Sequence, residues 1–246
     1  MTQAGTRAVP LTDDTSEAGA AAPRKRTSLS SSAIYERIKA MAARFEFKPG
    51  ERINEIELSR QFEVSRTPLR EVLNQLMVEG FLERTANKGF TSRTLDAKQV
   101  FDLYEYRLGL ETAIARLACK RATDQEIDEL AAATEHDTSI PDDSDSAHLL
   151  ALDEDFHMRL ARLSRNEEFV RALANVNARI QYVRWIDMRN GRRPYTQAEH
   201  VRIIEALRAR DQAGLVQLLE SHIARRQDQI TEVIKLGYSE IYTRRM

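Results

Sequence analysis

Residues 64–73 read VSRTPLREVL, and this stretch opens a segment with one apolar and one polar side. Ser65 is suited to cap a helix, and Pro68 is tolerated in a first turn, where its missing N–H has no intrahelical partner. Apolar residues then recur at offsets of three and four until Gly80, the period of a helix buried on one face: Leu69, Val72, Leu73, Leu76 and Met77. The stretch therefore predicts a helix with one face in a core.

The opposite face of this predicted helix carries two arginines and two smaller polar residues, namely Arg66, Thr67, Arg70 and Asn74. The major groove of DNA admits one α-helix, Arg can donate two hydrogen bonds to guanine, and Asn can pair with adenine. A solvated amphipathic helix would also expose arginines. The polar face alone leaves both interpretations open.

The neighbouring segments favour the interpretation that this helix contacts DNA. Upstream, the periodicity predicts a helix from residue 33 that ends before Pro49, followed by a short helix capped by Asn54. Downstream, residues 81–85 and 90–94 are two short runs that predict a β-hairpin. Three helices followed by a hairpin make a winged helix-turn-helix, in which the third helix enters the groove.

The stretch PGERINEIELSRQFEVSRTPLREVLNQLMVEGFLERTANKGF resembles the DNA-binding domain of the GntR family of bacterial transcription regulators. The residues that follow resemble the all-helical effector-binding domain of its FadR-type subgroup, called FCD, so that the likeness covers about residues 33–235. The resemblance implies that Arg66 and Arg70 contact bases or phosphates, with Thr67 in support. It also implies that the wing tip, with Lys88 and Gly89, approaches the minor groove.

Two features of the DNA-binding region stand apart from this pattern. Family members often carry a basic residue where this chain has Ile56, so a DNA contact at that position is not expected. The run Arg24–Arg26 can touch phosphates or can serve as a charged linker.

Composition limits the class of protein. The 246 residues carry 37 basic and 38 acidic side chains, which hides a local excess of six basic over four acidic groups within residues 60–93. The single cysteine, Cys119, cannot form an intramolecular disulfide, which favours a reducing cytoplasm. No apolar stretch is long enough to span a membrane and no secretory signal is seen, so the sequence predicts a soluble, cytoplasmic protein without a membrane partner.

The fold class expected is mainly α, with the winged helix-turn-helix followed by an all-α antiparallel bundle of about six helices. The predicted domains are a disordered tail (1–32), the DNA-binding domain (33–95), a metal- and effector-binding, dimerising domain (96–236) and a C-terminal tail (237–246). Helix starts are marked by Asp96 and Asp211 as caps and by capping-box patterns at Thr123/Glu126, Ser164/Glu167 and Thr196/Glu199. The bundle helices are predicted near 97–121, 124–136, 146–163, 167–189, 197–210 and 212–235.

Three of the five histidines fall on apolar stripes of separate predicted helices. His157 lies four residues after Asp153 on one stripe, while His200 and His222 lie on two later ones. A lone histidine on such a stripe is most often a core residue. A buried carboxylate with three imidazoles is costly unless a partner satisfies them, and a divalent metal satisfies all four. The FCD resemblance implies the same four ligands, with Zn expected first and Ni, Mn or Fe as alternatives.

Four protein ligands leave room on such an ion for an oxygen of a small organic acid. Arg107 falls inside an apolar stripe and needs an anion beside it, either Glu111 one turn on or a bound carboxylate. Asn177 and Arg184, on the inner edge of the fourth bundle helix, are further candidates to bind the acid, although a plain polar helix edge explains them equally well. The resemblance implies a small carboxylate effector.

The sequence therefore predicts a homodimeric, ligand-responsive transcription regulator, a repressor, that binds a pseudo-palindromic operator in double-stranded DNA. A metal-dependent enzyme of hydrolase or oxygenase type is the alternative, because the same ligands serve catalysis. No HExxH or GxSxG motif places a catalytic base or nucleophile, so the chain is expected not to be an enzyme. A third possibility is a metal-free domain whose histidines bind the effector carboxylate directly.

Overall fold

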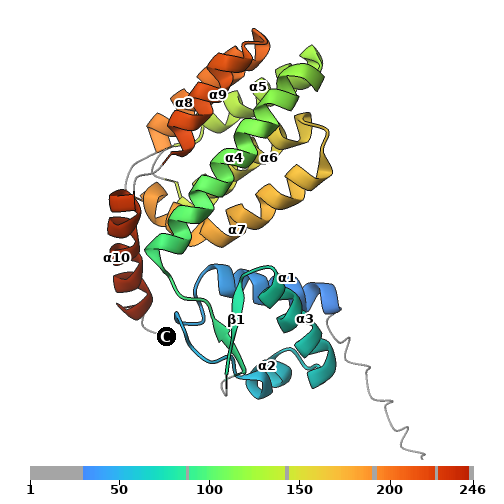
Figure 1. Cartoon of the computed structure of the whole chain (residues 1–246), viewed down its shortest axis with the longest axis vertical. Helices are drawn as coiled ribbons and strands as arrows, with labels where there is room; N and C mark the ends of the chain where they lie inside the picture. The colour runs from blue at the N-terminus through green and yellow to red at the C-terminus, as the bar shows by residue number, and fades with distance from the viewer. Residues whose placement is uncertain (1–29, 87–88, 142–143, 190–192, 225–226, 244–246) are drawn as a thin grey trace, which may run out of the picture.

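The computed structural model describes residues 30–86, 89–141, 144–189, 193–224 and 227–243, which form ten helices and one two-stranded hairpin (Figure 1). In chain order these elements are α1 (Ser31–Ala43), α2 (Glu55–Gln61), α3 (Arg66–Val78), β1 (Leu82–Thr85), β2 (Gly89–Ser92), α4 (Ala97–Arg121), α5 (Asp124–Thr138), α6 (Ser146–Leu163), α7 (Glu167–Arg189), α8 (Arg193–Arg208), α9 (Gln212–Ile223) and α10 (Gln227–Thr243).

The first three helices and the hairpin form the predicted winged helix-turn-helix, called the head below. Side chains from α1, α3 and the start of the wing fill its core, and Ile38, Leu73 and Phe81 are fully buried there. β1 pairs antiparallel with β2, from Leu82 opposite Ser92 to Thr85 opposite Gly89. The predicted apolar stripe of α3 is confirmed, because it is the face that turns into this core.

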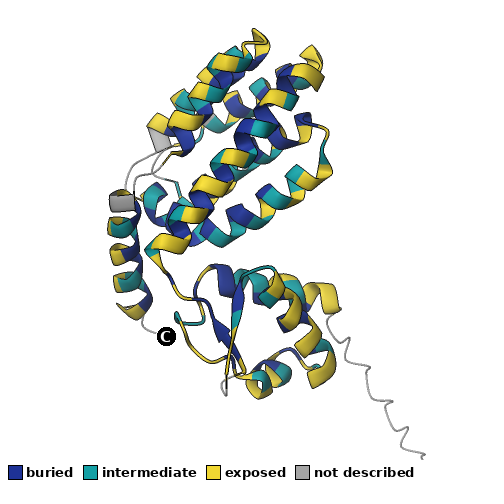
Figure 2. Cartoon of the chain, viewed as in Figure 1, coloured by how far each residue is buried: buried dark blue, intermediate teal, exposed yellow. Residues whose placement is uncertain are grey.

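Helices α4 to α10 form an all-helical bundle, as predicted. The long helix α4 packs against α6, α7, α9 and α10. Figure 2 shows the division that the helical period requires, with buried residues facing inward and exposed residues outward on each helix. The predicted bounds of α4, α6 and α7 agree with the structure, which gives α4 as Ala97–Arg121.

Two of the predicted capping boxes are wrong. Ser164 ends α6, and its hydroxyl donates to the Ala161 carbonyl, while Asn166 caps α7. Thr196 and Glu199 lie inside α8, which begins at Arg193, so neither residue marks a helix start. The pattern of a hydroxyl residue three before a glutamate also occurs within helices, where the backbone N–H groups already have partners. The box at Thr123/Glu126 and the Asn54 cap are confirmed.

The last predicted helix, residues 212–235, is two helices in the structure. Ala224 has an extended backbone that ends α9, and α10 begins at Gln227. The bundle thus has seven helices among the residues described, where about six were expected. Residues 237–243, predicted as a tail, belong to α10, because Ile234 and Ile241 are buried in the bundle core.

The head rests on α7 through a small set of contacts (Figure 1). Asn175 Nδ2 donates to the Glu79 carbonyl at 3.2 Å, at the C-terminal end of α3. The buried Arg93 donates to the backbone carbonyl of Arg179, and burial, with Arg179 nearby, lowers the pKa of Arg93 to about 10. These contacts join the C-terminal end of α3 and the residue after β2 to the middle of α7.

Phe45 completes this junction in a way that differs from the sequence prediction. The helix predicted from residue 33 to just before Pro49 would include Phe45, but α1 ends at Ala43 and Phe45 has a positive φ of 52°. Its ring packs edge-on against Tyr182 of α7, with centroids 5.4 Å apart, and Arg93 lies over its face. Phe45 therefore belongs to the core of the bundle although its sequence neighbours belong to the head.

Gly80 allows a stability test of this junction. Its φ of +82° is left-handed, and an added Cβ would lie 2.9 Å from the Arg179 guanidinium carbon. Gly50 has a similar φ of +72° with nothing within 4 Å of its Cβ position. We expect Gly50→Ala to lower the free energy of unfolding by about 1–2 kcal/mol through backbone strain, and Gly80→Ala to lower it further by displacing Arg179.

Urea denaturation of both variants measures the two losses. Equal losses would show that Arg179 moves aside freely and that the close approach at Gly80 adds nothing to the junction.

Candidate functional site

The exposed face of α3 carries all four residues predicted there to contact DNA. Arg66, Thr67, Arg70 and Asn74 are exposed, and Arg70 Nε lies 3.4 Å from a carboxylate oxygen of Glu55 on α2. A helix of the head thus presents two guanidinium groups and an amide to solvent. Ile56, the position where a basic residue is common, is also exposed, at 48%.

The wing tip is only partly described. Gly89 opens β2, is exposed and has a φ of +74°, a left-handed conformation that suits glycine at a hairpin turn. Lys88 lies outside the described residues, as does the basic run Arg24–Arg26.

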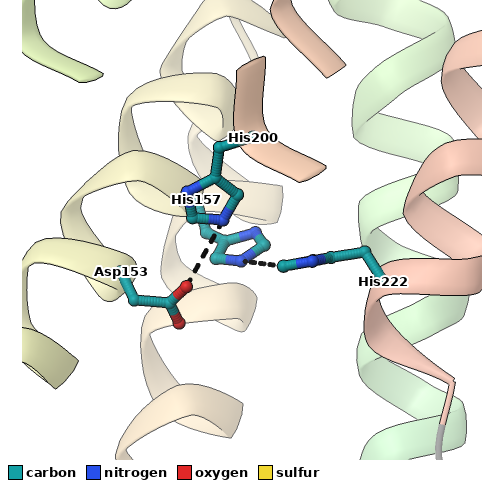
Figure 3. Close-up of side chains that lie close together, drawn as sticks. All are labelled: Asp153, His157, His200 and His222. Atoms are coloured by element: carbon teal, nitrogen blue, oxygen red, sulfur yellow. Dashed lines mark hydrogen bonds and ion pairs between the residues drawn. The ribbon is translucent and has the colours of Figure 1, made fainter. Parts of the chain in front are cut away.

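The four predicted metal ligands lie together in the bundle (Figure 3). Asp153 and His157 come from successive turns of α6, His200 from α8 and His222 from α9. One ligand atom from each lies within 4.8 Å of the others, and the three histidines are buried. His136 and His148, the two histidines not predicted as ligands, are exposed. The four residues predicted as ligands thus come from three helices and lie side by side in the structure.

The distances inside this cluster suit a shared cation. His157 Nε2 lies 3.1 Å from His222 Nε2, and His200 Nε2 lies 3.3 Å from Asp153 Oδ1. Neighbouring ligand atoms bonded to one zinc ion at about 2.1 Å are about 3.0–3.4 Å apart. Asp153 Oδ1 and His200 Nε2 are buried and face each other, but neither makes a hydrogen bond of good geometry, so both remain available to a shared cation. The donor set fits a divalent metal ion.

Two carboxylates hold the far side of the histidine rings. Glu111 of α4 lies 2.6 Å from His157 Nδ1, and Glu199 of α8 lies 2.7 Å from His222 Nδ1. A carboxylate accepts the Nδ1 proton, which leaves the lone pair on Nε2, the atom that faces the cluster. Phe156 stacks on His200 with centroids 3.7 Å apart and fixes that ring as well.

No pattern in the sequence predicted these supporting roles. Glu111 was considered only as a partner of Arg107, and Glu199 was assigned to a capping box. Glu199 and His222 lie 23 residues apart on different helices, so no local spacing connects them.

The surroundings keep the cluster in the charge state that metal binding needs. Burial raises the pKa of Asp153, but the Arg184 guanidinium and His200 outweigh it and hold that pKa well below its usual range. Burial lowers the pKa of His157 to about 3, despite the opposing effect of Glu111. Burial also lowers the pKa of His200. The carboxylate is thus ionised and both imidazoles are neutral at neutral pH, as ligands must be.

A small cavity of about 30 Å³ adjoins the cluster. Its lining includes Tyr104, Arg107, Asp153, Arg184, Thr196 and His222. Two of the three predicted effector-binding residues, Arg107 and Arg184, therefore reach it. Asn177 is buried with both side-chain amide atoms unpaired, but it is not among the residues that line this cavity.

Arg184 and Arg107 differ in whether they have an unpaired hydrogen-bond donor. Arg184 contacts Asp153 with one terminal nitrogen and Glu154 with the other, so both are occupied by carboxylates. Arg107 donates from Nε to Glu111 at 2.6 Å, the internal pair considered from the sequence, while its Nη2 is buried without a partner. Arg107 is thus the arginine with a free donor.

Comparisons with known proteins identify the class. Residues 30–91 match the family model described as bacterial regulatory proteins, gntR family, and residues 102–225 match the FCD domain. The chain therefore belongs to the GntR family and carries an FCD domain. It is a transcription regulator and not an enzyme, which answers the alternative raised from the sequence.

Relatives of known name support this assignment. The chain is 48% identical to the Nta operon transcriptional regulator of Aminobacter aminovorans, across 83% of this chain and 96% of that one. It is 30% identical to the uncharacterized HTH-type transcriptional regulator YdhC of Bacillus subtilis, across 83% and 92%. It is 23% identical to the HTH-type transcriptional repressor RspR of Escherichia coli, across 75% and 82%.

Solved structures share the fold. A putative GntR regulator from Rhodococcus sp. RHA1 aligns with a TM-score of 0.64 at 20% identity, across 83% of this chain and 97% of that one. McbR/YncC of E. coli aligns with a TM-score of 0.59 at 18% identity, across 87% and 98%.

Among the described residues, no helix is long and apolar enough to cross a membrane.

Arg184 provides a test of the buried charges. Its loss would leave Asp153 buried without its cation, so Arg184→Ala is expected to lower the free energy of unfolding of chelator-treated protein by about 3–5 kcal/mol. Arg189, one turn and a half further along α7 and 43% exposed, pairs with Glu240. Arg189→Ala is expected to cost less than about 1 kcal/mol.

Chemical denaturation of both variants gives the comparison. Losses of similar size would show that water already screens the Asp153 carboxylate.

Proposed function

We propose that this protein is a ligand-responsive repressor that binds a pseudo-palindromic operator as a homodimer and responds to a small carboxylate bound beside a metal ion. The observation that carries the proposal is that one chain holds an exposed, arginine-bearing recognition helix and a buried three-histidine cluster. The helix α7 contacts both regions. Binding to chromosomal DNA would place the protein in the cytoplasm.

Asp153, His157, His200 and His222 would hold the metal ion. Three imidazoles and one carboxylate, with no thiolate, suit Zn best, while Ni, Mn or Fe also accept such ligands. When bound, the ion would supply positive charge that attracts an anionic effector. The chain's own contribution is to hold two of the rings by carboxylates and to keep the site buried.

Arg107 is the best candidate to bind the effector carboxylate. Arg107 lines the cavity together with Asp153 and His222, and its Nη2 is buried without a partner, so a carboxylate that reached this nitrogen would satisfy a buried donor beside the metal ligands. Arg184 would contribute by position and charge, since both of its terminal nitrogens are already paired. Asn177 is the weakest of the three predicted effector residues, because it does not line the cavity.

The helix α7 offers a route from the effector to DNA. Arg184 lies on its inner side at the cavity, and Asn175, Ala178 and Arg179 contact the head about one and a half to two and a half turns earlier. A shift of α7 on effector binding would move the C-terminal end of α3 with it. A coupling of about 1–3 kcal/mol between the two sites is enough for regulation.

The two-fold symmetry common to regulators of this kind supports dimer formation, and the name of a relative supports repression. A two-fold dimer places two recognition helices in successive major grooves, about one helical turn apart, which calls for two inverted half-sites. RspR of E. coli, to which the chain is similar, is named a repressor.

The recognition helix is tested by Arg66→Ala and Arg70→Ala. Each is expected to weaken operator binding by about 1–3 kcal/mol if the side chain reads a base. Electrophoretic mobility shifts on the promoter next to the protein's own gene measure the loss. Arg159→Ala is the control, because Arg159 is an exposed arginine of α6 paired with Asp155, far from the head in sequence.

Unchanged affinity in both head variants would remove α3 as the recognition helix. A footprint without a protected palindrome would remove the specific operator, whatever the variants show.

The metal and effector are tested together by a thermal-shift screen of small organic acids, with and without chelator, on protein purified without an affinity tag. We expect one divalent ion per chain, and an acid that raises Tm only in the metal-loaded protein. His157→Ala and His200→Ala should lose the ion, whereas His136→Ala and His148→Ala, which alter exposed histidines, should keep it.

Full metal content in His157→Ala and His200→Ala would contradict the ligand set. An acid that stabilises the chelated and metal-loaded protein equally would instead support direct binding of the carboxylate by the histidines.

A further inference from the structure

Glu111 is the most deeply buried carboxylate around the cluster, and it is not one of the four candidate metal ligands. Its side chain is 1% exposed. Oε1 accepts from Arg107 Nε at 2.6 Å and Oε2 lies 2.6 Å from His157 Nδ1, so both oxygens are used. An isolated carboxylate at this depth would be very costly, and here a guanidinium on one side and an imidazole on the other offset that cost.

The direction of these contacts determines what His157 can do. With Oε1 held by Arg107, Oε2 is fixed in front of Nδ1 and accepts its proton. The ring then carries its lone pair on Nε2, which faces His222 Nε2 at 3.1 Å inside the cluster. The opposite tautomer would point a proton into the cluster and leave Oε2 without a donor.

We propose that Glu111 is a positioning residue of the metal centre, anchored by Arg107, which holds His157 in the tautomer and orientation that bind the ion. The inference rests on the proposed metal site and adds to it a residue outside the ligand set. Arg107 thereby has two tasks, since its Nε anchors Glu111 while its Nη2 keeps an unpaired donor in a side chain that lines the cavity.

Glu199 provides an internal comparison. It makes the same kind of contact, 2.7 Å from His222 Nδ1, but its side chain is 30% exposed. Water can therefore take over part of its role when it is replaced, whereas the Glu111 side chain is only 1% exposed to solvent. The two carboxylates should differ in how much metal binding depends on them.

The test uses Glu111→Gln and Glu199→Gln in the full chain, with Zn²⁺ alone as the probe. A glutamine at 111 can offer only one oxygen, which the charged Arg107 will take, so its amide N–H₂ will face His157 Nδ1 and favour the wrong tautomer. We expect Glu111→Gln to lower Zn²⁺ affinity about 10- to 100-fold, measured by competition with a chromophoric chelator. Glu199→Gln should lower the affinity less.

A second readout separates positioning from a general structural role. In ¹⁵N NMR spectra of the metal-free protein, His157 should carry its proton on Nδ1 in the wild type and on Nε2 in Glu111→Gln. Should Glu111→Gln fail to fold, Glu111→Asp keeps the charge but is shorter by one methylene. It can no longer reach both partners, and it should lower Zn²⁺ affinity about tenfold.

The possible outcomes separate the proposed metal site from the role of Glu111. A wild type that binds no Zn²⁺, with His157→Ala unchanged from it, would overturn the proposed metal site and this inference with it. A wild type that binds Zn²⁺, together with a folded Glu111 variant of the same affinity and the same His157 tautomer, would overturn only the role of Glu111.

Discussion

The pairing of buried charge is the constraint on which the bundle depends. Glu111 and Asp153 lie in an interior where an unpaired ion is not tolerated, and each is held by an arginine, Arg107 or Arg184. The Asp153–Arg184 pair joins α6 to α7, and Glu111, paired with Arg107 on α4, also contacts His157 of α6. The helices α4, α6 and α7 therefore cannot slide past one another without separating these charged groups from their partners. The same pairing keeps Asp153 ionised, as a metal ligand must be.

Much of this arrangement could be predicted because its causes are local. The stripe of α3 follows from residue spacing, and the cap at Asp96 follows from the side chain before the helix. The Asp153 and His157 pair lies one turn apart on a single helix, so its common face is a property of helical geometry. His200 and His222 could be added because each lies on the apolar stripe of its own helix, and stripes in a bundle face a shared interior.

What could not be predicted depends on contacts between distant segments. Glu199 meets His222 only because α8 packs against α9, so a capping-box pattern in the sequence gave it the wrong role. Phe45 follows a helix of the head but packs in the core of the bundle, because its ring contacts Tyr182 of α7, which lies far away in the sequence. The division of α9 from α10 at Ala224 was missed because the apolar periodicity continues on both sides of it. The cavity that Arg107 and Arg184 line, and Asn177 does not, likewise depends on how the helices pack.

The junction at α7 also bears on how this architecture can be recombined. The surface that supports the head belongs to the bundle, through Asn175 and Arg179, while the head reaches back with Arg93 and Phe45. The two domains are therefore not interchangeable modules joined by a neutral linker. A chimaera that carried this head on a different bundle would have to transplant the matching face of α7 as well, so within such regulators heads and bundles should be inherited as fitted pairs.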